Sequence, residues 1–173
     1  ARTARVFFIE EPIYTAARQS TLEVRVKDGV HVVVPHLPEG LSADEVVEKQ
    51  RVLLKGLCRQ CAVRRPLAWF YTPLSLPLVD GIDASAVVYD CMDDLTGFAM
   101  ASPELPKWES ELFNRASVVF TGGHSLYEVK RAQHPNVHPV PSSVDVAHFA
   151  KAQTQMPAPG DQRLLPRPRI GFA

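Results

Sequence analysis

Three aspartates occur within five residues, Asp90, Asp93 and Asp94, directly after the apolar run that ends at Tyr89. Carboxylates accept strong charge-assisted hydrogen bonds, so the cluster is suited to holding sugar hydroxyls. Crowding of like charges also raises the pKa of one member, which would make it a general base and a catalytic candidate. The alternative is a solvated turn in which Asp93 or Asp94 caps a helical turn, because turns favour Asp for local reasons.

A second polar group follows the apolar letters VVF, in the segment TGGHS. Gly122 and Gly123 let the backbone approach a ligand, and Ser125 with Glu128 forms a capping box that predicts a helix beginning there. His124 is placed to donate to a ligand oxygen or to deprotonate one. The segment is neither GxGxxG nor a P-loop, and tight turns use the same residues for steric reasons. Substrate binding and a plain turn both remain open.

A third polar group, Ser142, Ser143 and Asp145, follows the last apolar run and is also a candidate for substrate binding. A Ser-His-Asp hydrolase is excluded because the sequence has no nucleophile elbow of the form GxSxG. Simple turn formation is the alternative for these three residues.

The pair Cys58 and Cys61 has the CxxC spacing of redox and zinc sites. It falls late in an amphipathic helical pattern, and no second CxxC or His pair completes a zinc site. Cys61 continues the apolar stripe of Leu54 and Leu57, so we expect core packing and no metal site. The aromatic letters WFY at positions 69 to 71 lie inside an apolar run, which favours the core over a sugar-binding platform.

The elements that must position these residues alternate between strand and helix. Several of the apolar runs are continuous, as in strands covered on both faces of a parallel sheet. The class predicted is therefore α/β, with a Rossmann-like, mainly parallel sheet whose carboxyl ends line a binding cleft. The six runs are Val6 to Ile9, Val30 to Val34, Leu67 to Tyr71, Ala86 to Tyr89, Val118 to Phe120 and Val137 to Val140.

Local signals predict where these elements begin and end. Residues 22 to 34 form a β-hairpin with its turn at Asp28-Gly29, and Pro35 closes its second strand. A capping box at Ser42 opens a long helix over 44 to 63, and Ser102-Pro103 opens another. After Phe149 the composition becomes polar and proline-rich, which is typical of a linker.

Bulk composition excludes some classes of protein. The 173 residues carry 19 basic and 19 acidic side chains, so no net field attracts nucleic acid or anionic lipid. No run approaches the roughly 18 apolar residues that span a bilayer. Three cysteines do not form a disulfide framework, which favours a reducing, cytoplasmic location.

Taken together, the segments VFFIEEP, WFYTP, VVYDCMDDLTGF, VFTGGHSLYEVKR, HPNVHPVPSSVDVAHF and PRPRIGFA resemble one family. They are similar to the amino-terminal domain of bacterial GT-B-fold glycosyltransferases, in the group of retaining, sugar-nucleotide-dependent enzymes of polysaccharide assembly. The most specific blocks are YDCMDD, FTGG with SLYEVKR, and PSSVD with HF. The resemblance runs in order along almost the whole chain.

The resemblance implies that residues 1–149 form the acceptor-side, Rossmann-like domain, that 150–169 link the domains and that 170–173 begin a donor-binding domain. It implies a transferase in which this domain binds no cofactor, the nucleotide-sugar donor occupies the missing carboxyl-terminal domain, and no metal is required. The partners are then a glycan or lipid-linked acceptor and the missing domain of the same chain, with no nucleic acid. Action at the inner face of the membrane is compatible with this role.

The chain also departs from the family pattern. The family's first strand, with its glycine-containing loop and helix, does not precede Ala1, so an open sheet edge is expected. This polypeptide alone is then expected to be inactive. Two alternatives stay open: a non-catalytic carbohydrate-recognition or scaffolding module, and half of a GT-B-fold sugar-nucleotide epimerase.

Overall fold

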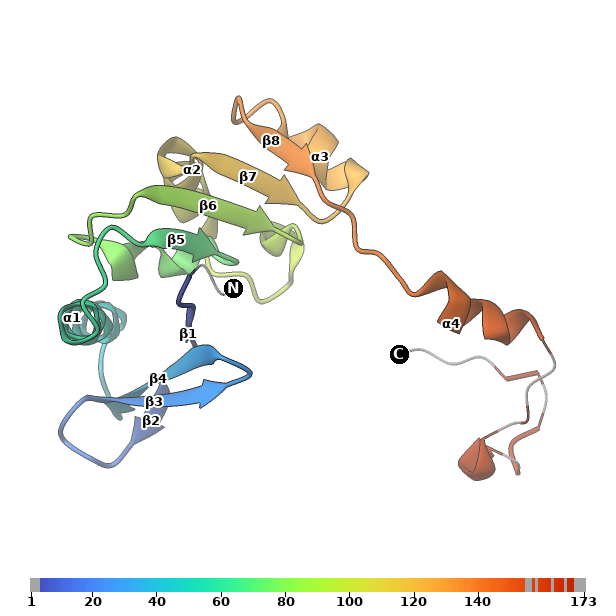
Figure 1. The fold of residues 1–173 in the computed structure, drawn as a ribbon, viewed down its shortest axis with the longest axis horizontal. Coiled ribbons are helices and arrows are strands. Elements are labelled where there is room, and N and C mark those ends of the chain that lie inside the picture. The colour runs from blue at the N-terminus through green and yellow to red at the C-terminus, as the bar shows by residue number, and fades with distance from the viewer. Residues whose placement is uncertain (1–3, 155–156, 158, 163, 167, 170–173) are drawn as a thin grey trace. The chain divides into compact units, whose positions relative to one another are not determined.

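The computed structural model describes residues 4–154, 157, 159–162, 164–166 and 168–169. The chain divides between Pro141 and Ser142 into two units, and each is described by itself. The first unit is an α/β, Rossmann-like structure in which helices flank two sheets made mainly of parallel strands (Figure 1). The described residues of the second unit contain only short helices.

The first sheet is built around β4, whose partners run on both of its edges. Strands β1 and β2 pair parallel with β4 one after the other, and β3 pairs antiparallel along the other edge. The turn predicted at Asp28-Gly29 joins β3 to β4, and both residues have positive φ, 49° and 78°. Such a turn matches the right-handed twist of the two strands. The bounds are β1 Phe7–Ile9, β2 Ile13–Thr15, β3 Thr21–Lys27 and β4 Val30–Pro38.

Pro35 does not close its strand, as the sequence pattern predicted, but lies inside β4 and is buried. The pairing explains why it is tolerated. On one edge β1 pairs with β4 as far as Val33, and β2 takes over at His36. Pro35 falls between the two partners, where that edge of β4 has no ladder to which a backbone N–H would contribute.

Helix α1, Ala43–Gln60, lies between the first sheet and the second (Figure 1). The predicted capping box is present: Glu45 N donates to Ser42 Oγ at 3.4 Å, and Ser42 N donates to Glu45 Oε2 at 2.8 Å. Leu54 and Leu57 bury one stripe of the helix against Val33, which forms a small core beneath the first sheet.

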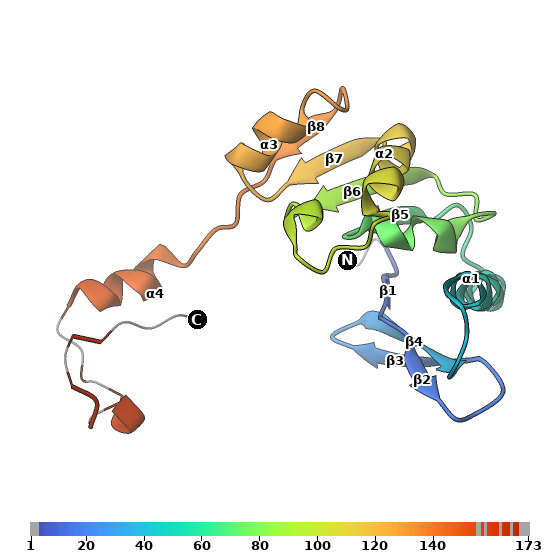
Figure 2. The ribbon, with the colours of Figure 1, turned by 180° about the vertical axis from the view of Figure 1, so that it is seen from behind.

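The second sheet is entirely parallel, in the order β5-β6-β7-β8, so the expected single sheet is divided into two. Among the described residues, β1 is an edge strand of the first sheet and β5 is an edge strand of the second. Helices α2 and α3 and the 3₁₀ helix η1 pack on one face (Figure 2), and Figure 1 views the other face, which carries no helix of this unit. The bounds are β5 Leu67–Phe70, η1 Pro73–Val79, β6 Ala86–Cys91, η2 Leu95–Gly97, α2 Leu105–Arg115, β7 Val118–Thr121, α3 His124–Lys130 and β8 Val137–Pro139.

Two predicted helix starts were wrong by a residue or two. Ser102 opens only a turn, in which its Oγ accepts Glu104 N at 3.3 Å, and α2 begins at Leu105. Helix α3 begins at His124 with Gly123 as its N-cap, so Ser125 lies in the first turn and forms no capping box. The close approach of Gly122 to the Met92 carbonyl directly precedes this start.

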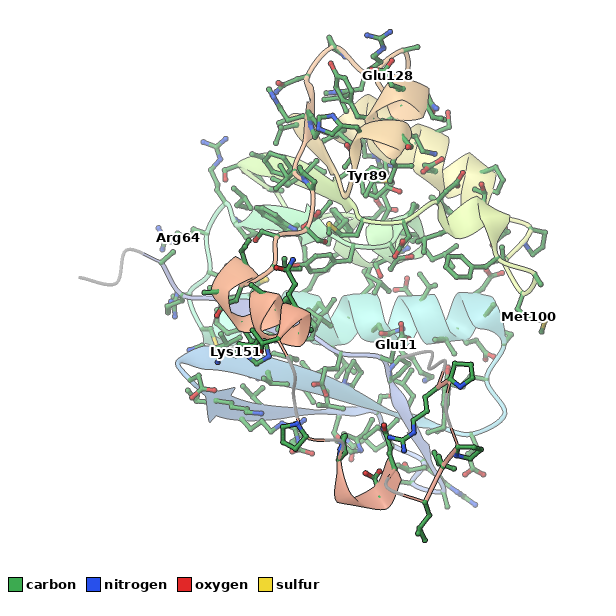
Figure 3. All side chains as sticks on the ribbon, turned by 90° about the vertical axis from the view of Figure 1, so that its right-hand side faces the viewer. Glu11, Arg64, Tyr89, Met100, Glu128 and Lys151 are labelled. Atoms are coloured by element: carbon green, nitrogen blue, oxygen red, sulfur yellow. The ribbon has the colours of Figure 1, made fainter. Side chains whose placement is uncertain are left out.

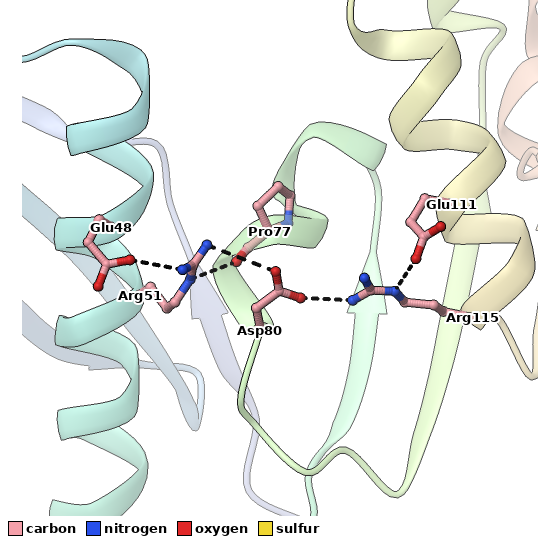
Figure 4. Close-up of polar contacts among 6 residues, drawn as sticks. All are labelled: Glu48, Arg51, Pro77, Asp80, Glu111 and Arg115. Atoms are coloured by element: carbon pink, nitrogen blue, oxygen red, sulfur yellow. Dashed lines mark hydrogen bonds and ion pairs between the residues drawn. The ribbon is translucent and has the colours of Figure 1, made fainter.

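An ionic network joins the two layers of helices through Asp80, which follows η1 (Figure 4). Arg115 of α2 donates to Asp80 Oδ1 at 2.8 Å and to Glu111 at 2.7 Å. Arg51 of α1 donates to the Pro77 carbonyl at 3.2 Å and lies 3.9 Å from Asp80 Oδ2. These hydrogen bonds to Asp80 and Glu111 raise the pKa of Arg115. The network therefore holds α1 and α2 in register across η1.

The second unit begins at Ser142, whereas the sequence places the end of the first domain at Phe149. It contains α4 Val146–Ala150 and the 3₁₀ helices η3 Lys151–Gln153 and η4 Gly160–Gln162. The predicted start of a further domain at 170–173 lies outside the described residues. In the part of the chain that the structure describes, no helix combines the length and apolar character that crossing a membrane requires.

Candidate functional site

Two of the three polar segments meet at the carboxyl edge of the second sheet. In the register of β6, β7 and β8, Cys91 lies beside Thr121, and Thr121 lies beside Pro139. Gly122 N then donates to the Cys91 carbonyl at 3.0 Å. The aspartate segment and the TGGHS segment are therefore neighbours in space, as parallel strand ends must be.

Gly122 is required by this close approach. A side-chain Cβ at position 122 would collide with the carbonyl oxygen of Met92 in the neighbouring loop. At Gly123 a Cβ would meet nothing within 4 Å. The backbone approach predicted for the glycines is thus between two strand-end loops, and Gly122 alone makes it necessary.

The three aspartates do three different things. Asp90 lies in β6 on the helix-free face, where its Oδ2 accepts the indole N–H of Trp69 at 3.1 Å. Asp93 is exposed, and its backbone carbonyl accepts a hydrogen bond from the Cys91 thiol, with 3.6 Å between sulfur and oxygen. Asp94 caps η2 by accepting Thr96 N at 3.3 Å and Thr96 Oγ1 at 2.6 Å.

The expectation that crowding raises a carboxyl pKa is wrong for Asp94. The hydrogen bond from the Thr96 hydroxyl lowers the pKa of Asp94, and the more distant Lys130 charge lowers it further. Asp94 is therefore ionised at neutral pH and caps a turn, which was the alternative interpretation of this residue. Asp90 is the member of the cluster whose carboxylate lies beside an exposed ring.

That ring corrects a second expectation, because Trp69 is not a core residue. Its side chain is 47% exposed, and Tyr71 is also exposed, whereas Phe70 between them is buried. Trp69 stacks on Phe120 at a centroid distance of 5.7 Å, and Phe120 lies 6.3 Å from the ring of His138. We call these three residues with Asp90 the aromatic row. Strand alternation places the row on the face without helices.

The opposite face carries a buried ionic cluster that sequence reasoning missed. Lys130 of α3 donates to both carboxylate oxygens of Glu109 in α2, at 2.9 and 2.8 Å. Tyr89 of β6 donates to Glu109 Oε1 at 2.9 Å, and Figure 3 shows Tyr89 among the strands of the second sheet. Burial raises the pKa of Tyr89 and of the neighbouring Cys91.

The signal for this cluster was present in the sequence. Glu109 falls on the stripe of α2 that also contains Leu105, Leu112 and Phe113, all buried. A carboxylate on an apolar stripe needs a buried cation, because an unpaired buried charge is very costly. Lys130 meets that need from α3 and so fixes α3 and its preceding loop over the sheet.

The remaining predicted residues are dispersed. His124 and Ser125 are exposed in the first turn of α3. Ser142, Ser143 and Asp145 belong to the second unit, whereas the other candidates belong to the first. Asp145 is the N-cap of α4, where Oδ1 accepts His148 N at 3.0 Å, which is the turn-forming role weighed for it.

The cysteines are all free thiols. Cys61 packs against the core of the first sheet, as its stripe predicted, and burial raises the pKa of Cys58. Among the described residues, no group of three or more His, Cys, Asp or Glu side chains is arranged to hold a metal ion.

Comparison of the sequence with protein-family models gave no match, and a search among curated proteins gave none either.

Proposed function

We propose that this chain is the acceptor-side domain of a glycosyltransferase of the GT-B type, which presents a glycan or lipid-linked acceptor to a sugar-nucleotide donor. The observation that carries the proposal is the meeting of two family-like blocks at one edge. The blocks YDCMDD and FTGG with SLYEVKR are far apart in sequence, yet Gly122 N donates to the Cys91 carbonyl. Ligands of open parallel sheets bind at such an edge.

The aromatic row supplies the chemistry of acceptor binding. A half-exposed indole offers its apolar face to the C–H groups of a sugar ring, and a carboxylate beside it accepts hydroxyl hydrogen bonds. Trp69 and Asp90 are held together by their own hydrogen bond, so both are oriented before a sugar arrives. Such preorganisation reduces the entropic cost of binding.

In this proposal the donor nucleotide and the groups that stabilise its leaving diphosphate belong to another domain of the same protein. The chain alone then binds acceptor and transfers nothing. The proposal requires neither a metal ion nor a cofactor in this domain.

A carbohydrate array and calorimetry test the proposal. The purified chain is expected to bind a subset of uncharged oligosaccharides, and Trp69→Ala and Asp90→Asn each weaken that binding by about tenfold, the value of one good contact. Val26→Ala, which also removes an exposed apolar side chain but from β3, is the control and leaves binding unchanged.

Two results would contradict the acceptor-side assignment. One is that the chain binds sugar nucleotides with one particular nucleobase more tightly than it binds inorganic pyrophosphate. The other is retention of oligosaccharide binding in the Trp69→Ala and Asp90→Asn variants. Oligosaccharide binding without any transfer by the full-length protein would instead favour a non-catalytic carbohydrate-recognition module, which the exposed Trp69 ring also suits.

A further inference from the structure

A hollow of about 440 Å³ opens at the amino-terminal edge of the second sheet, opposite the edge of the candidate site. Its walls are the last turns of α1, the loop 63–66 before β5 and the loop 81–83 before β6. Four cations line it, Lys55, Arg59, Arg64 and Arg65, against the single carboxylate of Asp83. Arg64 lies on the outer side of the unit in Figure 3.

The cations are largely uncompensated by protein carboxylates. Arg65 lies 3.5 Å from Asp83, and that pair is exposed to solvent. Within the described ranges, no ion pair involves Lys55, Arg59 or Arg64. A neutral chain has thus concentrated like charges around one concavity, where their mutual repulsion is unfavourable unless an anion binds.

Capping of α1 does not account for these side chains. Backbone N–H groups already satisfy the carbonyls of Leu57, Cys58 and Arg59, and the Arg5 guanidinium donates to the Cys61 carbonyl at 2.8 Å. Lys55 lies more than a turn before the helix end, where the helix dipole has little effect. Lys55, Arg59 and Arg64 are therefore available to a ligand, whereas Arg65 is paired with Asp83.

The loop that presents the arginine pair has a defined and costly conformation. Ala62 and Arg65 have φ of 49° and 46°, in the left-handed region that non-glycine residues rarely adopt. Such conformations persist only where surrounding contacts determine them. Ser85 N and Ser85 Oγ both donate to the Pro66 carbonyl, at 2.8 and 3.2 Å, which ties this loop to the start of β6.

We propose that this hollow binds a diphosphate group. Guanidinium groups match phosphate oxygens with two parallel hydrogen bonds, and a lysine adds a point charge. Three unpaired cations call for more charge than a carboxylate or a single phosphate ester carries, and a diphosphate supplies it. The group is free pyrophosphate or the diphosphate headgroup of a lipid, since both present the same oxygens. The site is separate from the aromatic row and does not depend on the proposed transferase activity.

The test titrates the 173-residue chain with inorganic pyrophosphate in a calorimeter at low and at physiological salt. The double variant Arg59→Gln/Arg64→Gln is expected to bind at least about tenfold more weakly, since each cation contributes a charge-assisted hydrogen bond. The control Arg18→Gln/Lys27→Gln removes the same charge from exposed positions away from the hollow and changes the affinity less than about twofold. Equal weakening by both double variants would show diffuse attraction and overturn the proposal.

Cys58 lines the hollow and reports occupancy directly. Pyrophosphate is expected to slow alkylation of Cys58, followed by peptide mass spectrometry, and this protection disappears in Arg59→Gln/Arg64→Gln. Unchanged alkylation at saturating pyrophosphate, or absence of pyrophosphate binding, would overturn the site.

Vesicles distinguish the two sources of the phosphate group. Phosphatidylcholine vesicles containing diacylglycerol pyrophosphate, whose headgroup is a diphosphate, are sedimented with the chain, with phosphatidylcholine alone as the blank. Binding that pyrophosphate displaces and that Arg59→Gln/Arg64→Gln abolishes supports the site with a lipid source. Pyrophosphate binding without vesicle binding supports it with a free source. Vesicle binding that survives in the double variant, together with no pyrophosphate binding, contradicts it.

Discussion

The two faces of the second sheet differ in what they do with polar side chains. Tyr89 and Asp90 are consecutive in β6, yet Tyr89 donates into the buried cluster of Glu109 and Lys130, whereas Asp90 accepts a hydrogen bond at a surface with exposed rings. On the face that the helices cover, the charged side chains hold α2 and α3 in place. The other face keeps a carboxylate and an indole accessible to a ligand.

Polarity alone therefore does not identify a functional residue in this sheet. Glu109 and Lys130 are the most deeply buried acidic and basic side chains described, at 9% and 4% exposure, and their partners are each other. Among the residues that the structure describes, the only side-chain partner of the Asp90 carboxylate is the neutral indole of Trp69, so its oxygens remain able to accept further hydrogen bonds. Substitutions on the first face should therefore change stability, and those on the second should change binding.

The largest effect is expected for Lys130→Met, which leaves Glu109 buried without its cation. We expect the free energy of unfolding to fall by about 3–5 kcal/mol in a urea titration. In Glu109→Gln/Lys130→Met no buried charge remains and Tyr89 keeps an acceptor, so much of the loss is recovered. A loss below about 1 kcal/mol in the single variant would mean that the cluster is not a stabilising unit.

Gly122→Ala tests the close approach of two loops at the carboxyl edge of the second sheet. The added methyl group meets the Met92 carbonyl, so the loops must separate, at a cost of about 1–3 kcal/mol. Gly123→Ala adds the same methyl group in open space, with φ of −174°, and is the matched control. Thermal melts that do not separate the two variants would contradict the close approach.

Trp69→Ala tests the helix-free face. Trp69 is half exposed, so its removal is expected to lower the free energy of unfolding by only about 1 kcal/mol, mostly through its stacking on Phe120. Oligosaccharide binding is expected to fall about tenfold in the same variant. A stability loss as large as that of Lys130→Met would show that Trp69 is a packing residue after all.

The smallest effect is expected for Asp94→Asn, and it depends on pH. The folded pKa of Asp94 is lowered, so its ionised form contributes stability above the unfolded pKa, about 3.9, and that contribution is lost as pH falls through the folded value. The variant is expected to differ from wild type by less than about 0.5 kcal/mol at pH 7 and to match it at strongly acid pH. A difference that grows on acidification would contradict this role.

In the second sheet, the sequence pattern predicted the strands but not the starts of the helices. The apolar runs predicted β5, β6, β7 and β8 closely, because these strands are apolar on the face that the helices cover. Their continuity indicated cover on both faces, which is wrong for this unit, since exposed Leu67 and Trp69 lie on the face without helices. The order of these strands also places the Asp90 and Gly122 segments at one edge, so this part of the site was predictable. The starts of α2 and α3 were not, because Ser102 caps a separate turn before α2 and because Gly123, not Ser125, is the N-cap of α3.

Composition concealed the basic hollow. Equal numbers of acidic and basic residues made a polybasic surface an unlikely feature, yet a neutral total places no limit on local charge. The letters CRQCAVRRP put Arg59, Arg64 and Arg65 within seven positions, but their convergence with Lys55 needed the helix end and the strained loop.

The sequence by itself determined the α/β class, the turn at Asp28-Gly29, the capping box of α1 and the strand-end position of the aspartates, since these depend on side chains close together along the chain. Only the tertiary structure decided that Trp69 is exposed beside Asp90, that Pro35 lies inside a strand and that Lys130 neutralises Glu109. Each of these depends on which element packs on which face. That choice is made by contacts between residues far apart in the chain, which local pattern does not contain.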